Sequence, residues 1–174
     1  MPAMNPTQIA QRLSEKFGSA ILESLPEDKH PRVHVNAKDW RAIAEFLKSD
    51  EGMDFDFLLC LTSVDYVADN LLGVVYDLRS MTHRHEFAVK VLIDRDNPTC
   101  ASVMDLWPAA DWHEREAYDM MGIIFEGHSD LRRILLPEDW EGYPLRKDYV
   151  FQREYHGIPG TYELDWAQKP DYPA

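Results

Sequence analysis

The stretch from residue 55 to residue 93 constrains the fold more than any other part of the sequence. It contains three segments rich in β-branched and aromatic residues, Phe55–Val67, Leu71–Leu78 and Glu86–Ile93, joined only by short polar connections. Connections as short as Asp69-Asn70 and Arg79–Arg84 can join antiparallel neighbours, whereas parallel neighbours need a long crossover. The three segments are therefore predicted to form the antiparallel centre of a sheet.

Amphipathic helices are predicted on both sides of these strands in the sequence. Asn5-Pro6 and Gly18 bracket apolar residues spaced four apart, as the start and end of a helix would. A second apolar stripe precedes Gly52. Two helices are expected at about 6–17 and 37–49. A third helical region is expected to begin after Asn97-Pro98, to break at Pro108 and to resume at Ala109–Met121. A hairpin is expected at 19–25 and 32–35.

This order of elements predicts an α+β fold rather than an alternating, doubly wound one. We expect two layers, with a mixed and mainly antiparallel sheet and helices on one face. With 174 residues the chain should hold one core domain, residues 1–136, followed by an extended tail, residues 137–174.

The tail is unusual because it combines loss of periodicity with many aromatic residues, and rings left in water are a liability. It is expected to lie either against its own domain or against a partner, and the sequence leaves both open. Its aromatic residues are Trp140, Tyr143, Tyr149, Phe151, Tyr155, Tyr162, Trp166 and Tyr172.

Charge and composition exclude several classes of function. The formal net charge of −13 disfavours nucleic acid and bare anionic membrane as partners. Apolar runs are too short to span a bilayer, so membrane contact is expected only through a partner. The N-terminus lacks the pattern of a leader and indicates a mature cytoplasmic start. Cys60 and Cys100 are too few and too far apart for a cluster or a structural zinc, and are expected to be reduced.

Catalytic motifs are missing from the sequence: it has no Gly-rich nucleotide loop, no nucleophile elbow and no HExxH. His83 and His85 would share one face of a strand and, with His113 or His128, could hold a metal ion. A solvent-side turn is the stronger interpretation, because metal sites need several convergent ligands.

The most informative block begins at the predicted helix 109–121. Apolar residues point in every direction around this helix, so it should be buried on most sides and its charges should be paired. Arg132 and Arg133 are the nearest supply of partners. Two other interpretations remain: paired carboxylates for acid–base chemistry, and an exposed helix with weak surface ion pairs.

Residues 145–149 mix both charge signs with apolar residues. They could form a capped surface turn, or an extended segment that presents Arg146 and Lys147 to another subunit with Tyr149 as an anchor. The spacing does not decide between the two.

The whole block resembles a known family. Glu114-Arg115-Glu116, Asp119, His128 and Arg132-Arg133, followed by LLPEDWEGYPLRKDY, are similar to the signature of the C subunit of proton-translocating NADH:quinone oxidoreductase, respiratory complex I. The resemblance is close over residues 111–149 and looser upstream.

The resemblance implies a scaffold subunit of the hydrophilic arm, peripheral and on the cytoplasmic side of the bacterial inner membrane. It implies docking on the D subunit, beside the B subunit with which D forms the quinone cavity. FMN and iron–sulfur clusters would belong to partner subunits, so no catalytic, cofactor-binding or metal-binding residue is expected in this chain. Electron transfer from NADH to quinone, coupled to proton translocation, would belong to the assembly.

The resemblance also sharpens the expected roles of residues. Glu114, Glu116 and Asp119 are expected to pair with Arg115, Arg132 and Arg133 and hold the helix against the segment that follows. Residues of the partner interface are expected to be Trp140, Pro144, Arg146, Lys147 and Tyr149.

Two alternatives stay open. One is the equivalent subunit of a membrane-bound hydrogenase or of a ferredoxin-dependent plastoquinone reductase complex. The other is a free-standing enzyme that uses the carboxylate cluster, which is the weaker of the two.

Overall fold

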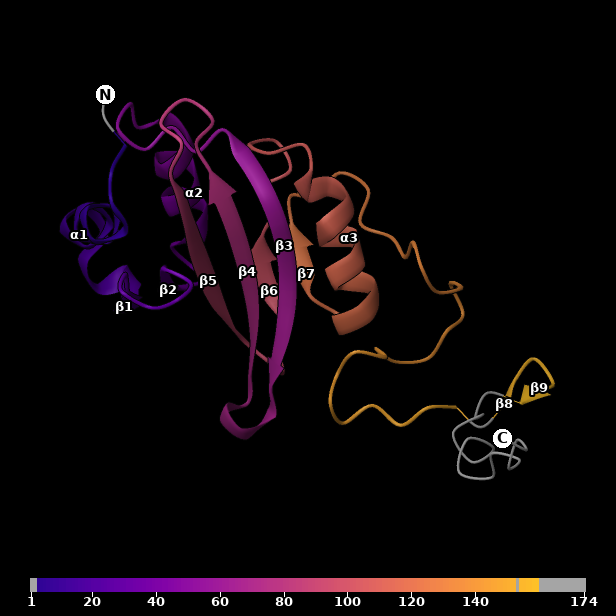
Figure 1. Cartoon of the computed structure of the whole chain (residues 1–174). Coiled ribbons are helices and arrows are strands. Elements are labelled where there is room, and N and C mark those ends of the chain that lie inside the picture. Colours follow the sequence, from indigo (N-terminus) through magenta and orange to yellow (C-terminus); the bar gives the residue numbers. More distant parts are fainter. Residues whose placement is uncertain (1–2, 153, 160–174) are drawn as a thin grey trace, which may run out of the picture.

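The computed structural model describes residues 3–152 and 154–159, and it contains one five-stranded sheet with helices packed against it (Figure 1). Helices lie at α1 (Pro6–Phe17), α2 (Trp40–Ser49) and α3 (Ala110–Met121), with 3-10 turns at Gly18–Ala20 and Val67–Asp69. Strands lie at β1 (Ile21–Leu25), β2 (Arg32–Asn36), β3 (Phe57–Tyr66), β4 (Leu71–Arg79), β5 (Glu86–Asp94), β6 (Thr99–Ala101), β7 (Ile124–Glu126), β8 (Glu154–Tyr155) and β9 (Ile158–Pro159).

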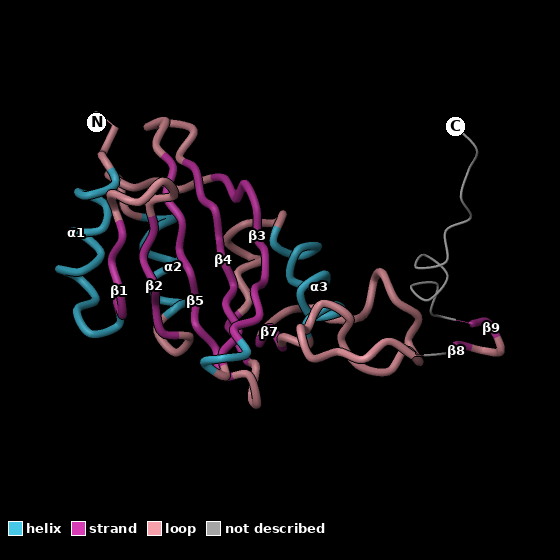
Figure 2. Tube along the Cα trace, turned by 60° about the horizontal axis from the view of Figure 1, so that its bottom comes forward, coloured by secondary structure: helices cyan, strands magenta, loops and turns pink. Residues whose placement is uncertain are grey.

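The sheet is mixed and mainly antiparallel, as predicted. Its strand order is β1-β2-β5-β4-β3, and β2 and β5 are the one parallel pair among these five strands. The three central segments form the antiparallel run β3, β4 and β5, and the first two strands form the expected hairpin. Figure 2 shows the five strands side by side.

Alternation along the strands separates a buried face from a more polar one. Val33, Val89, Tyr76 and Leu61 are aligned across four strands and are all buried. The residues next to them in sequence point to the opposite face and form the row His34, Lys90, Val75 and Thr62.

Helices α1 and α2 cover the buried face. Ile9 and Leu13 of α1 are fully buried, and the helix starts with a capping box between Asn5 and Gln8. Trp40 of α2 lies against Tyr76 of the sheet, with ring centroids 4.2 Å apart. Helix α3 lies beside the edge strand β3 (Figure 1).

The helix expected after Asn97-Pro98 is the main difference from the prediction. Residues 99–101 form the strand β6 instead, parallel to β7. The amide of Ile124 donates to the carbonyl of Pro98, and the amide of Ser102 donates to the carbonyl of Glu126. Because these backbone groups are used between the two segments, residues 98–102 cannot bond along a helix, and the helix begins only at Ala110.

Truncation of a fully buried residue tests this core. Leu13→Ala should lower the free energy of unfolding by about 2–5 kcal/mol, because it removes apolar contacts and leaves a cavity. Leu22→Ala, at a side chain 51% exposed, is the control and should change it by less than about 0.5 kcal/mol. Urea unfolding followed by circular dichroism measures both, and equal losses would contradict the assigned core.

Candidate functional site

Three of the four buried Asp, Glu or Arg residues in the described part of the chain lie on helix α3. Glu114 and Asp119 are fully buried, and Arg115 is 5% exposed. The helix ends at Gly122, whose φ of +72° is the left-handed conformation that glycine adopts without strain. This helix and the segment after it, through residue 152, form the candidate site.

Asp119 organises the segment that follows β7. Its Oδ2 accepts hydrogen bonds from the backbone amides of Ile134, Leu135 and Leu136 at 2.6–3.0 Å. Its Oδ1 accepts from Nη1 of Arg133 at 2.9 Å. Burial alone would raise the pKa of this carboxyl, but the three amides and the guanidinium outweigh burial and lower the pKa below its ordinary value. Asp119 is therefore held as a buried, compensated anion.

Arg133 extends this arrangement to the next turn of the chain. Its Nη2 donates to the carbonyls of Trp140 and Gly142. The guanidinium carbons of Arg133 and Arg146 both lie near the Tyr143 ring, 5.5 and 5.1 Å from its centroid. A side chain at Gly122 would collide with this ring, since a Cβ there would lie 2.5 Å from Tyr143.

Glu114 faces the other side of the helix, toward the residues after β6. Its carboxylate accepts hydrogen bonds from the Ser102 hydroxyl at 2.5 Å and from the Val103 amide at 2.8 Å. Nε2 of His128 lies 4.0 Å away. Burial raises the pKa of Glu114 above its ordinary value, although these donors and His128 favour the charged form.

His128 links the two ends of the site region. Its ring is completely buried, its Nδ1 accepts a hydrogen bond from the Asp130 amide, and its Nε2 lies 3.1 Å from a carboxylate oxygen of Asp111. Because Nδ1 accepts, a neutral ring carries its proton on Nε2, which donates to the backbone carbonyl of Asp111 at 3.2 Å.

The expected pairing of three acids with three arginines is realised only in part. Arg133 pairs with Asp119 as expected. Arg115 stacks on Trp112 and lies 4.0 Å from Asp130, rather than pairing with an acid of its own helix.

Arg132 and Glu116 differ from the expectation. Arg132 pairs with Asp130, with 66% of its side chain exposed. Glu116 is exposed and makes no ion pair with any of the described residues. Although Arg132 and Arg133 are neighbours in sequence, Arg132 points to the exposed Asp130 and Arg133 to the buried Asp119.

Two of the predicted interface residues, Arg146 and Lys147, contact their own domain. The Leu145 amide donates to the carbonyl of Met120, and Nε of Arg146 donates to the carbonyl of Met121, which caps the C-terminus of α3. The Lys147 amide donates to the buried carboxylate of Asp65. Of the two possibilities left open for the tail, contact with its own domain holds for residues 143–148.

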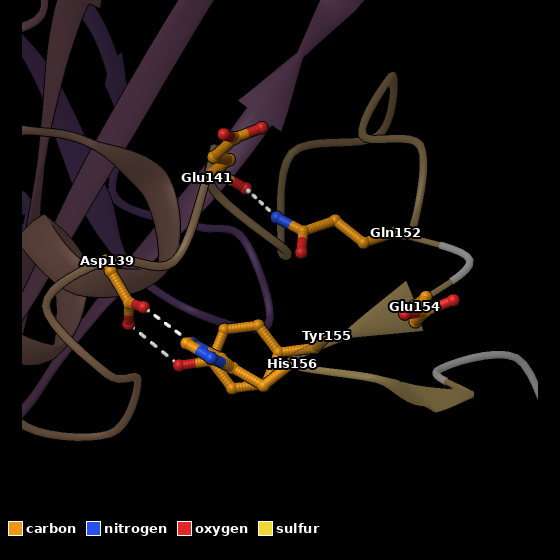
Figure 3. Close-up of a pocket in the computed structure, with 6 residues that line it drawn as sticks. All are labelled: Asp139, Glu141, Gln152, Glu154, Tyr155 and His156. Carbon is orange, nitrogen blue, oxygen red and sulfur yellow. Dashed lines mark hydrogen bonds and ion pairs between the residues drawn. The ribbon is translucent and has the colours of Figure 1, made fainter.

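The tail then folds locally on itself. Nε1 of Trp140 donates to the hydroxyl of Tyr149, which in turn donates to the carbonyl of Glu141. The small hairpin of β8 and β9 is fastened by Asp139, whose carboxylate binds the Tyr155 hydroxyl and the His156 ring at 2.7 Å each (Figure 3). Pro144 is half-buried. The predicted aromatic residues Tyr162, Trp166 and Tyr172 lie outside the described residues.

The histidine pair is buried rather than solvent-facing. His83 bonds to the carbonyl of Glu51 and His85 to the carbonyl of Met53, so both rings hold the loop before β3. Within residues 3–152 and 154–159, no three His, Cys, Asp or Glu side chains are grouped closely enough to hold a metal ion.

Four residues that support the site were not singled out for it from the sequence. Ser102 and Val103 bind Glu114 from a segment predicted as helix. Asp65 and Arg95 form a buried ion pair at 3.0 Å. A signal for Asp65 was present, because a carboxylate inside a strand on the face that otherwise carries Leu61 must find a partner.

Comparison with known protein families places these contacts in a wider context. A family model described as the 30 Kd subunit of the respiratory-chain NADH dehydrogenase matches residues 33–155. The C subunit of NADH-quinone oxidoreductase from Chlorobium phaeobacteroides is 47% identical over 150 residues, which are 85% of this chain and 90% of that protein. The C subunit from Chloroherpeton thalassium is 50% identical over 160 residues, which are 90% of this chain and 66% of that protein.

Solved structures share the fold. The trypsin-resistant fragment (1-134) of Nqo5 has a TM-score of 0.63 and 28% identity, and it covers 74% of this chain and 100% of the fragment. A chain of the membrane-bound sulfane sulfur reductase, an archaeal respiratory membrane complex, has a TM-score of 0.72 and 23% identity over 98% of this chain and 96% of that one. At that identity the second likeness concerns the fold alone.

Neighbouring arginines test the buried pair. Arg133→Ala should lower the free energy of unfolding by about 3 kcal/mol or more, because it removes the counter-charge of the buried Asp119. Arg132→Ala, at an exposed pair, is the matched control and should change it by less than about 1 kcal/mol. Thermal unfolding of the two variants is the measurement, and similar losses would show that Asp119 does not depend on Arg133.

Glu114 should make stability depend on pH. Its pKa is raised in the folded state, so the folded protein holds the proton more tightly, and stability should fall as the pH rises from 4.5 through the folded pKa. Glu114→Gln should remove this fall, since the amide mimics the protonated acid. Urea midpoints from about pH 4 to about pH 8 measure it, with the exposed Glu116→Gln as control. A fall that persists unchanged in Glu114→Gln would refute the assignment.

Proposed function

Because the chain belongs to the family of the 30 kDa subunit of respiratory-chain NADH dehydrogenase, we propose that it serves as the C subunit, a scaffold, of an NADH-quinone oxidoreductase. In this proposal the chain performs no reaction of its own. Its task is to dock on the D subunit near the quinone site and support electron transfer from NADH to quinone, coupled to proton translocation.

One observation carries the scaffold proposal: the buried charged groups of α3 form hydrogen bonds that fix other segments of the same chain. Asp119 binds three consecutive amides, Glu114 binds a hydroxyl and an amide, and the Arg146 guanidinium caps the helix. Groups whose hydrogen-bonding capacity is used in this way stabilise a shape. Such an arrangement supports a docking role for the segment that they fix.

The partners in this proposal follow from the family. The D subunit is the main contact, and the B subunit lies nearby. FMN and the iron–sulfur clusters are assigned to partner subunits, with none on this chain. The negative charge of −13 supports protein partners rather than nucleic acid.

The docking segment consists of residues 140–151. Within it, Trp140, Arg146 and Tyr149 hold the segment's conformation through contacts inside the chain. Pro144 restricts the backbone, and Lys147 is exposed. We assign all five to the partner interface, three mainly through the shape that they impose.

The chain is proposed to be peripheral, on the cytoplasmic side of the bacterial inner membrane. Among the described residues, the helices are all too short or too polar to cross a bilayer. Attachment to the membrane would therefore pass through the other subunits of the complex.

The equivalent subunit of a related membrane complex is the second candidate. The observation that favours it is the likeness of nearly the whole chain to a chain of the sulfane sulfur reductase complex, which concerns the fold. The relatives with higher identity are named as NADH-quinone oxidoreductase subunits, so the first candidate is preferred.

Native purification tests the proposal. A tag on this chain should bring down flavin- and cluster-bearing subunits and NADH:quinone activity, while the chain alone should show no cofactor absorbance and no turnover. Mass spectrometry identifies the partners. A hydrogenase subunit in place of an NADH-oxidising one would favour the second candidate. Recovery of the chain alone would refute both.

A further inference from the structure

Arg95 connects the sheet to the docking segment. It follows β5, only 12% of its side chain is exposed, and its guanidinium contacts two carboxylates. Nε and Nη2 donate to the two oxygens of Asp65 at 3.0 and 3.2 Å, and Nη2 also donates to Asp148. Asp65 belongs to the sheet and Asp148 to the docking segment, so one side chain ties the two together. We call Asp65, Arg95 and Asp148 the latch.

The latch holds residues 147 and 148 of the docking segment against the sheet. Besides the Arg95–Asp148 pair, the Lys147 amide donates to Asp65 at 2.9 Å. Two residues later the chain exposes an apolar pair, with Val150 85% and Phe151 51% exposed. The Phe151 ring packs edge-on against Tyr149, with centroids 5.1 Å apart. The apolar pair therefore follows directly after the two residues that Arg95 and Asp65 tie to the sheet.

The surroundings of the apolar pair define what could cover it. Large apolar side chains exposed next to one another mark contact sites. Among the described residues from 138 to 154, the exposed charged residues are mostly acidic: Glu138, Asp139, Glu141, Asp148 and Glu154, against Lys147. A surface complementary to this one is apolar at its centre and basic at its rim.

Resting on the proposed function, we propose that the latch positions Val150 and Phe151 to enter an apolar hollow, rimmed by Lys and Arg side chains, on the partner subunit of the complex. Arg95 and Asp148 are positioning residues in this role. They act by ordering residues 147–151 before the partner arrives, which lowers the entropy lost on docking.

Three variants separate the latch from the contact. Asp148→Ala opens the latch at its exposed end, where 57% of the side chain is in solvent, and leaves the buried Arg95–Asp65 pair intact. Val150→Ser with Phe151→Ser removes the apolar contact and leaves the latch closed. Asp105→Ala removes a similarly exposed aspartate, 60% exposed and paired with Arg41 at 2.6 Å, elsewhere on the domain. It is the matched control.

Two measurements are made on each tagged full-length variant. Amide hydrogen exchange at Lys147 in the isolated chain reports whether the latch is closed. The amount of chain that co-purifies with the other subunits, at low and high salt, reports docking. Asp148→Ala should speed the exchange at least about tenfold and reduce co-purification. The double serine variant should reduce co-purification with wild-type exchange, and Asp105→Ala should change neither. Wild-type docking should weaken in high salt.

Several outcomes would overturn the inference while the proposed function stands. If Asp148→Ala speeds amide exchange at Lys147 without any loss of co-purification, the latch does not position the docking segment. The double serine variant could co-purify like wild type, which would remove the apolar contact. Docking of the wild-type chain that is equally strong at low and high salt would refute the basic rim on the partner. If the wild-type chain itself brings down no other subunit, the proposed function fails. The wild-type result therefore distinguishes failure of the proposed function from failure of this inference.

Discussion

The Asp119 carboxylate is a buried negative charge that the fold can hold only by bringing another part of the chain to it. The groups that compensate this charge do not belong to helix α3 itself but to residues 133–136. Three amides in a row fix the path of that segment, and Arg133 carries the constraint on to the carbonyls of residues 140 and 142. The path of residues 133–142 therefore depends on this one anion, whereas residues 145–148 are held by the end of α3 and by Asp65 and Arg95.

The periodic parts of the fold could be predicted from the sequence. Strands β3, β4 and β5 and helix α2 have clear alternation or a clear apolar stripe, and burial of that pattern decides their structure. Strand β6 could not be predicted, since three residues carry no period and Pro98 suits a helix start equally well. Its conformation depends on pairing with residues 124–126, which lie beyond the predicted helix.

The site could be predicted as a list of residues better than as a set of contacts. All-round apolarity correctly indicated that much of α3 is buried and that Glu114 and Asp119 need compensation, but Trp112 and Glu116 are exposed. The partners of Glu114 are a hydroxyl and a backbone amide, and a backbone amide has no signature in a sequence. The adjacent pair Arg132-Arg133 shows the same limit, because only the three-dimensional path of the segment decides which guanidinium faces inward.

The parallel pairing of β2 with β5 has a consequence for the order in which the chain can assemble. Strand β2 has β1 on one side and β5 on the other, and β5 is reached only after α2, β3 and β4. On a ribosome the first hairpin emerges long before the strand that it joins, whereas β3, β4 and β5 are neighbours in sequence and can pair at once. The β1–β2 hairpin therefore cannot join the rest of the sheet until β5 has been synthesised.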